Sequence, residues 1–167
     1  MGKAWSGSTI VTAVLEPGDK APDFTLLDQH GQPFTLSSSL KARKAPHLCY
    51  FYPKADTPGC TTQACGLRDI LDQVGDTVVV GISPDKPARQ ARFDEKYGLG
   101  FPLLADEDHA VAEAYGVWGE RSMYGRKYMG IIRSAFLIDS KAKIAEAWYK
   151  VSPKDTPTNL LRALDRK

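Results

Sequence analysis

Two cysteines five residues apart, Cys60 and Cys65, lie in the stretch of sequence with the strongest chemical signal. Thr57 and Pro58 precede them, and a hydroxyl residue followed by proline is typical of the first positions of a helix. Cys60 would then lie in the first helical turn. There the unpaired backbone N–H groups and the positive end of the helix dipole favour a thiolate over a thiol. The pattern therefore predicts a reactive cysteine at position 60.

The spacing of the two cysteines indicates when they could bond to each other. Residues five apart on an α-helix lie roughly 140° apart around the axis and about 8.5 Å apart between Cα atoms. A disulfide tolerates Cα separations of up to roughly 7 Å, so Cys60 and Cys65 can meet only once the first turns of the helix unravel. Gly59 and Gly66, both poor helix formers, bracket the segment that would open. This favours a cycle of oxidation, local unfolding and disulfide closure; two unrelated cysteines in one helix are the alternative.

The same stretch resembles the active-site motif of a known family. Pro53, Thr57 and Cys60 reproduce the P-x-x-x-T-x-x-C pattern of the peroxiredoxins. The longer run FYPKADTPGCTTQAC, at 51–65, resembles the bacterioferritin comigratory protein or peroxiredoxin Q subfamily. The likeness covers most of the chain, from about residue 15 to residue 164, and includes GDKAPDF at 18–24, VGIS at 80–83 and RSAFLID at 133–139.

The resemblance implies a role for each of five residues. Cys60 would attack the O–O bond of a peroxide as a thiolate and become a sulfenic acid. The hydroxyl of Thr57 would bond a peroxide oxygen, and Pro53 would shield the thiolate from water. Arg133 would stabilise the thiolate and polarise the peroxide. Cys65 would be the resolving cysteine, which closes an intramolecular disulfide that thioredoxin or a similar dithiol reduces; no metal or other cofactor takes part.

Without the resemblance, the residues support less. Thr57 is then only a helix cap, and Arg133 cannot be told from the other arginines of the chain. Cys49 lies inside the apolar run 48–52 and is predicted to be a buried, inert thiol. The three histidines form no cluster with the cysteines at zinc spacing, so no metal site is expected.

Length and composition exclude several classes of protein. The 167 residues are 43% hydrophobic and 25% charged, and 22 basic against 20 acidic residues leave a formal charge of +2. This gives no argument for binding nucleic acid or a membrane surface, and no apolar run approaches the roughly 18 residues of a membrane helix. Three cysteines are too few for a disulfide scaffold, which favours a reducing, cytoplasmic location. We expect a loosely ordered extension over residues 1–14 and one domain over residues 15–167.

The order of the expected elements indicates the fold class. Strands are expected at 24–27, 33–36, 47–52, 77–83, 101–104, 134–138 and 144–151. Helices are expected at 58–74, 87–97, 108–115 and 158–164, with a short helix or loop at 37–44 and a surface loop at 117–132. Asp108 is the expected cap of the third helix, and Thr156 or Thr158 that of the last. The order indicates a layered α/β domain with a central mixed sheet and an added N-terminal β-hairpin, and the resemblance implies a thioredoxin-like fold.

The leading hypothesis is a thiol peroxidase of the atypical two-cysteine type, an antioxidant enzyme for hydrogen peroxide and organic hydroperoxides. A monomer is favoured over a dimer, with peroxides and a dithiol reductant as partners. One alternative is a thioredoxin-fold copper carrier, since paired cysteines bind soft cuprous ion, but this leaves Thr57 and Arg133 without a role. A dithiol–disulfide oxidoreductase acting on proteins is the other, but it usually carries the C-x-x-C spacing, which this sequence lacks.

Overall fold

The structure, a computed structural model, describes residues 14–165 of the chain. The strands are β1 (Thr25–Leu27), β2 (Pro33–Thr35), β3 (His47–Phe51), β4 (Val78–Ser83), β5 (Leu103–Ala105), β6 (Trp118–Met123), β7 (Arg126–Ile131), β8 (Ser134–Ile138) and β9 (Ile144–Trp148). The α-helices are α1 (Leu36–Arg43), α2 (Pro58–Asp69), α3 (Pro87–Tyr97), α4 (Ala110–Ala114) and α5 (Asp155–Asp165). None of the helices within residues 14–165 has the length and hydropathy required to cross a bilayer. The predicted extension lies outside the described residues except for Val14, so its boundary stays a prediction.

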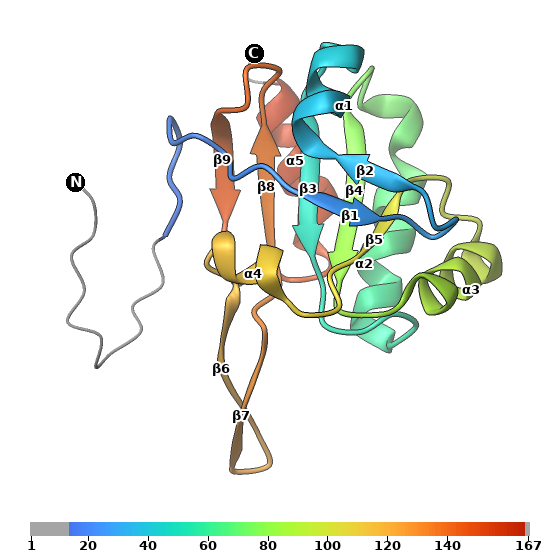
Figure 1. Cartoon of the computed structure of the whole chain (residues 1–167), viewed down its shortest axis with the longest axis vertical. Coiled ribbons are helices and arrows are strands. Elements are labelled where there is room, and N and C mark those ends of the chain that lie inside the picture. Colours follow the sequence, from blue (N-terminus) through green and yellow to red (C-terminus); the bar gives the residue numbers. More distant parts are fainter. Residues whose placement is uncertain (1–13, 166–167) are drawn as a thin grey trace.

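β3 is an interior strand of a mixed sheet and carries the chain to the candidate site. The sheet order is β2-β1-β5-β4-β3-β8-β9 (Figure 1). β3 runs parallel to β4 and antiparallel to β8, and β4 runs parallel to β5. The hairpin β1–β2 joins the far edge through β5. The mixed α/β sheet and its N-terminal hairpin are therefore as predicted.

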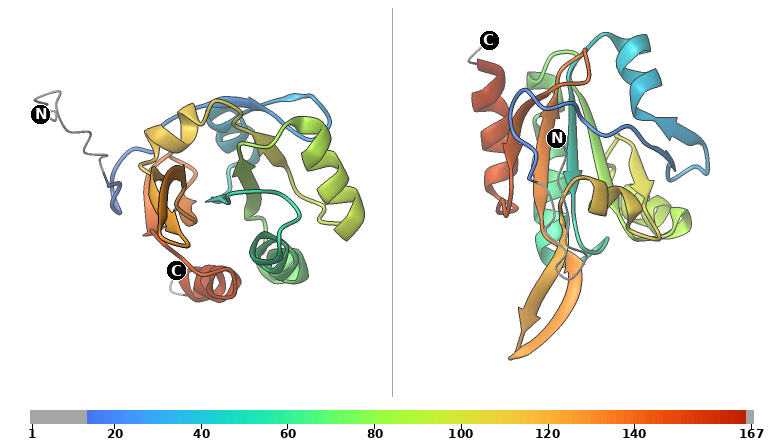
Figure 2. Two further views of the ribbon diagram at one scale, coloured as in Figure 1. Left: turned by 90° about the horizontal axis from the view of Figure 1, so that it is seen from below. Right: turned by 60° about the vertical axis from the view of Figure 1, so that its left-hand side comes forward.

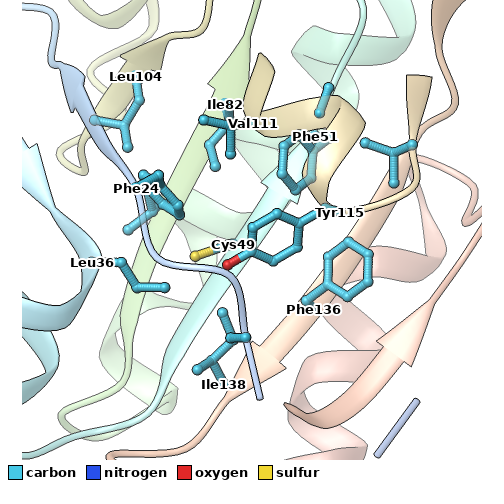
Figure 3. Close-up of a cluster of buried hydrophobic side chains, with 14 of the residues drawn as sticks. Phe24, Leu36, Cys49, Phe51, Ile82, Leu104, Val111, Tyr115, Phe136 and Ile138 are labelled. Carbon is cyan, nitrogen blue, oxygen red and sulfur yellow. The ribbon is translucent and has the colours of Figure 1, made fainter. Parts of the chain in front are cut away.

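Alternate residues of the central strands contribute to two separate cores, one on each face of the sheet. Leu48 and Tyr50 point into the core that β3 shares with α2 and α5, which lie side by side on one side of the sheet (Figure 2). Cys49 and Phe51 point into the opposite core, which is covered by α1 and α4 (Figure 3). All of β3 is buried as a result, which explains why every residue after His47 in this strand is apolar or aromatic.

The segment 117–132 is not the predicted surface loop but a two-stranded arm. β6 and β7 pair antiparallel from Trp118 opposite Ile131 to Met123 opposite Arg126. Figure 1 shows this arm projecting away from the body of the domain. Most of its side chains are exposed or half-buried. Because neither face of the arm packs fully on a core, the sequence carries no clear alternation of apolar and polar residues there.

Helix α2 is shorter than predicted. It ends at Asp69 instead of continuing to residue 74, because Ile70 has a φ of −109° and a ψ of 9° and leaves the helical conformation. The chain continues as the 3-10 helix Leu71–Gln73. The apolar spacing runs on past the true end because both helices face the same core, through Leu67, Ile70, Leu71 and Val74.

Helix α4 begins differently from the prediction. His109, with a φ of +52°, is the residue before its first turn. The carboxylate of Asp106 accepts hydrogen bonds from the backbone N–H groups of Val111 and Ala112 at 3.1 and 2.9 Å. The expected cap, Asp108, accepts one bond of 3.2 Å from the first helical residue. The main capping carboxylate is therefore two residues earlier than expected.

Helix α5 begins at Asp155, three residues before the predicted start. The hydroxyl of Ser152 accepts a hydrogen bond from the backbone N–H of Asp155 at 3.1 Å, as a capping side chain does. Thr156 and Thr158, the predicted caps, both lie inside the helix. Thr156 is buried and has a different function, because its hydroxyl contacts α2.

Candidate active site

Cys60 lies in the first turn of α2, as the sequence predicts. Thr57 is the N-cap residue, with an extended backbone (φ −96°, ψ 159°), and Pro58 is the first helical residue. Pro53 is half-buried in the loop that joins β3 to α2. The side chain of Cys60 is only 1% exposed. Its sulfur is thus shielded from bulk water while lying at the positive end of the helix.

The hydroxyl of Thr57 does not cap the helix. It donates a hydrogen bond of 2.8 Å to the backbone carbonyl of Lys54 instead, and no side-chain cap bond forms. The predicted N-cap position is therefore right, but the side-chain hydrogen bond that a capping threonine usually makes to the helix does not form. Because the hydroxyl proton is engaged with the carbonyl of Lys54, the lone pairs of the oxygen are available to accept a hydrogen bond from another group.

Arg133, the residue directly before β8, contacts the sulfur of Cys60. Its Nη1 donates to Sγ of Cys60 at 3.5 Å. The contact spans 73 positions of sequence and depends on the sheet, because Phe51 at the end of β3 pairs with Ser134 at the start of β8. A guanidinium held beside a sulfur favours negative charge on it. The structure thus brings together two residues that only the family resemblance linked.

Glycines let both ends of the cysteine segment approach their neighbours closely. A Cβ on Gly59 would lie 3.1 Å from Nη2 of Arg133, so the missing side chain leaves room for the guanidinium. A Cβ on Gly66 would lie 2.9 Å from Cγ of Pro157 in α5, closer than a real Cβ comes to another heavy atom. The sequence marks both glycines only as poor helix formers; the structure adds a packing role for each.

Gln63 belongs to the site, although the sequence analysis did not identify it. It lies on α2 between the two cysteines and is fully buried. Its Oε1 accepts a hydrogen bond from Nη1 of Arg133 at 2.8 Å, and its Nε2 donates to Oγ1 of Thr156 at 2.9 Å. Gln63 therefore orients the guanidinium and ties α2 to α5. The only sequence signal was its position three residues after Cys60, on the same side of the helix.

A pocket of about 340 Å³ lies beside the first turn of α2. It is lined by Pro58, Gly59, Thr62, Ser152, Pro153 and Lys154. Gly59 lies against the guanidinium of Arg133 as well as this pocket, which places the pocket next to the candidate site. A larger hollow of about 550 Å³ is lined by Pro46, Gln73, Val74, Asp76, Thr77, Leu161, Leu164 and Asp165, and none of these belongs to the candidate site. We therefore associate the smaller pocket with the chemistry.

The three cysteines are all free and have different surroundings. Cys65 is half-buried on α2, where the intact helix keeps it beyond disulfide reach of Cys60. Cys49 is fully buried in the opposite core, and burial raises the pKa of its thiol to about 12. Among residues 14–165, no three His, Cys, Asp or Glu side chains gather as metal ligands. The expected absence of a metal stays a prediction.

Comparisons with known proteins agree with this geometry. Residues 17–147 match the AhpC/TSA family. The putative peroxiredoxin bcp of Haemophilus influenzae is 52% identical over 144 residues, which cover 84% of this chain and 90% of that protein. Peroxiredoxin Bcp of Escherichia coli is 53% identical over 132 residues, which cover 78% of this chain and 83% of that protein.

Solved structures show the same fold. The bacterioferritin comigratory protein of Xanthomonas campestris, studied for its alkyl peroxide reduction activity, matches with a TM-score of 0.80 and 33% identity over 92% of this chain and 98% of its own. Peroxidoxin BcpB of Mycobacterium tuberculosis matches with a TM-score of 0.78 and 35% identity over 91% and 97%.

The chain therefore belongs to the AhpC/TSA family. Its relatives are peroxiredoxins of the Bcp or peroxiredoxin Q type, which confirms the resemblance seen in the sequence and the thioredoxin-like fold. The chain is thus an enzyme of the peroxidase class.

Proposed function

We propose that Cys60 reduces hydrogen peroxide and organic hydroperoxides and is regenerated through a disulfide with Cys65. The observation that carries the proposal is the placement of Nη1 of Arg133 3.5 Å from the sulfur of Cys60, in the first turn of α2. The alkyl peroxide reduction activity of the Xanthomonas campestris relative supports organic hydroperoxides as substrates. Pro53 and Thr57 lie in the loop that joins β3 to α2, directly before the turn that holds Cys60, which supports their proposed roles in shaping the pocket.

The first step breaks the O–O bond of the peroxide. The thiolate of Cys60 attacks one peroxide oxygen and becomes a sulfenic acid, and the other oxygen leaves as an alcohol or water after taking up a proton. The free lone pairs of Thr57 accept a hydrogen bond from the peroxide O–H. The guanidinium of Arg133 stabilises charge on the sulfur and on the separating oxygens. This step does not need Cys65 and takes place while α2 is folded.

The second step requires α2 to open. Cys65 attacks the sulfenic sulfur of Cys60, a disulfide forms and the sulfenic oxygen leaves as water. Because the folded helix keeps the cysteines apart, the segment between them must unravel. The two hydrogen bonds of Gln63, to Arg133 and to Thr156, then break. Thioredoxin or a similar dithiol takes up the disulfide by exchange, which restores both thiols, and the helix re-forms.

We also propose that the chain works as a monomer in the cytoplasm. An odd number of cysteines, all free within the described residues, suits a reducing compartment in which disulfides are transient. Size-exclusion chromatography of the reduced protein tests the oligomeric state.

Substitution Cys65→Ser tests the cycle. In stopped-flow mixing with hydrogen peroxide, the variant should react at the wild-type rate but consume one peroxide per chain, because Cys60 chemistry does not need Cys65. Mass spectrometry should then find a sulfenic acid on Cys60, and turnover coupled to thioredoxin should be lost. Cys49→Ala is the matched control, since Cys49 lies on the other face of the sheet, and it should keep full turnover. Full thioredoxin-coupled turnover in Cys65→Ser would show that Cys65 is not the resolving residue.

A further inference from the structure

The loop Pro53–Thr57, between β3 and α2, is held by side chains from a different part of the fold. Ala55, at its middle, is fully buried. Its backbone N–H donates to Oδ2 of Asp85 at 2.7 Å, and its carbonyl accepts a hydrogen bond from Nη2 of Arg89 at 3.1 Å. Both backbone polar groups of one loop residue are therefore bound by side chains at the junction of β4 and α3.

Asp85 is itself firmly fixed. Its side chain is 8% exposed. The hydroxyl of Ser83 donates to the same Oδ2 at 2.7 Å, and Nε of Arg89 lies 3.1 Å from Oδ1. A carboxylate that accepts hydrogen bonds from Ala55 and Ser83 and also pairs with a guanidinium has little freedom to move. Asp85 and Arg89 thus form a rigid clamp on Ala55.

Helix α3 holds the next loop residue as well. Asp56 has a φ of +62°, in the left-handed region that aspartate tolerates better than most residues. Its carboxylate accepts a hydrogen bond from the hydroxyl of Tyr97 at 2.9 Å and pairs with Nζ of Lys96 at 3.1 Å. Two consecutive residues of the loop are therefore attached to α3, and these contacts do not involve α2.

We infer that Asp85 is a positioning residue for the peroxide step, acting through Ala55 on the Pro53–Thr57 loop. The inference rests on the proposed function, in which Pro53 and Thr57 shape the peroxide site and α2 unravels afterwards. A loop attached to α3 keeps its conformation while α2 opens. The hydroxyl of Thr57 is therefore already in place each time Cys60 returns with the re-formed helix. Asp85 contributes to the first chemical step and not to reduction of the disulfide.

The test measures the two half-reactions separately. In Asp85→Ala, the second-order rate constant of the reduced protein with hydrogen peroxide should fall about 10- to 100-fold, since a shift of roughly 1 Å in a reacting group has an effect of this size. Asp85→Asn keeps an oxygen for Ala55 but loses the charge that pairs with Arg89. Its rate constant with hydrogen peroxide should therefore lie between those of wild type and Asp85→Ala. The rate at which dithiothreitol reduces the Cys60–Cys65 disulfide should stay within about twofold of wild type in both variants, because α2 is open in that step. General damage to the fold would not produce this split.

Arg92→Ala, which removes an exposed charge from the same helix α3, is the control and should leave both rates unchanged. A wild-type peroxide rate in Asp85→Ala would overturn the inference, and so would an equal fall of both rates in Asp85→Asn. If Asp85→Ala does not fold, as judged by urea unfolding, the test is the comparison of the peroxide rate and the dithiothreitol rate in Asp85→Asn. Failure of the wild-type protein to consume peroxide would instead overturn the proposed function, and the inference with it.

Discussion

Cys49 and Cys60 are almost equally buried, at 0% and 1% exposure, but they lie on opposite faces of the sheet. Around Cys49, Figure 3 shows aliphatic and aromatic side chains, with Tyr115 the only labelled neighbour that carries a polar group. Cys60 has the first turn of α2 and the guanidinium of Arg133 beside its sulfur. The difference teaches that exposure does not distinguish Cys60, the proposed nucleophile, from Cys49. The groups that face each sulfur do distinguish them.

The apolar surroundings of Cys49 support the prediction that this thiol is inert. A thiolate transferred into such a core loses its hydration without gaining a partner, so burial raises the pKa of Cys49 to about 12. At neutral pH the side chain is then a neutral thiol and packs as a small hydrophobic group. On the other face of the sheet, the sulfur of Cys60 has a fixed donor beside it, Nη1 of Arg133 at 3.5 Å, and it lies in the first turn of α2.

Replacement of the thiol of Cys60, compared with replacement of the thiol of Cys49, should give the largest difference in peroxide consumption. Cys60→Ser should abolish measurable peroxide consumption, because a serine hydroxyl is not ionised near neutral pH. Cys49→Ala should keep the peroxide rate within about twofold, since nothing at that position faces the substrate. Peroxide loss measured in the presence of thioredoxin compares the two. Residual turnover in Cys60→Ser that disappears only when Cys49 is also replaced would reverse the comparison.

Removal of the guanidinium tests whether charge, and not burial, makes the difference. In Arg133→Gln the peroxide rate constant should fall about 10²- to 10³-fold, the usual effect of removing one preorganised donor from a reacting centre. Stopped-flow mixing with hydrogen peroxide measures it.

The matched control is Arg126→Gln, which removes an exposed arginine from β7. Its rate should equal that of wild type. An unchanged rate in Arg133→Gln would mean that the helix dipole alone separates Cys60 from Cys49.

The smallest effect is on stability at high pH. Because the pKa of Cys49 is raised from 9.0 to about 12, the unfolded chain ionises at this residue above pH 9 while the folded chain does not. Its contribution to stability is therefore complete below pH 9 and is lost as the pH rises toward 12. By pH 10 the loss amounts to about 1.4 kcal/mol of the free energy of unfolding. Cys49→Ala should lack this part of the pH dependence in urea unfolding between pH 8 and 10.

Val80→Ala is the control for this measurement. Val80 pairs with Cys49 across β3 and β4 and is fully buried, but it does not titrate. The substitution should lower the free energy of unfolding by a similar amount at every pH and keep the wild-type slope. Equal slopes in wild type and Cys49→Ala would contradict the raised pKa.

The sequence predicted those elements whose pattern is local. The buried strands β3 and β4 are predicted from their mainly apolar runs. Helix α3 begins at Pro87 and is followed by Gly98, as expected. The arm β6–β7 was missed because it packs on no core along most of its length. Its one local signal was the turn at Tyr124 and Gly125, where both residues have a positive φ, as two-residue hairpin turns require.

The candidate site was predictable only as far as its residues are neighbours in sequence. Thr57, Pro58 and Cys60 form one local motif, and the structure places them at the start of α2 as expected. The contacts of Gln63 with Arg133 and of Ala55 with Asp85 join residues 70 and 30 positions apart. Such contacts depend on the sheet order and on the packing of α3 and α5, which no local pattern contains.

The contact between Gly66 and Pro157 has a practical consequence. While α2 is folded, it covers the ring of Pro157 so closely that no side chain fits between them. Unravelling of α2 in the disulfide form would leave that ring and the adjoining side of α5 facing solvent. Oxidised chains should therefore be retained longer than reduced chains on a hydrophobic chromatography resin, which would allow the redox state of an unlabelled sample to be assayed by elution.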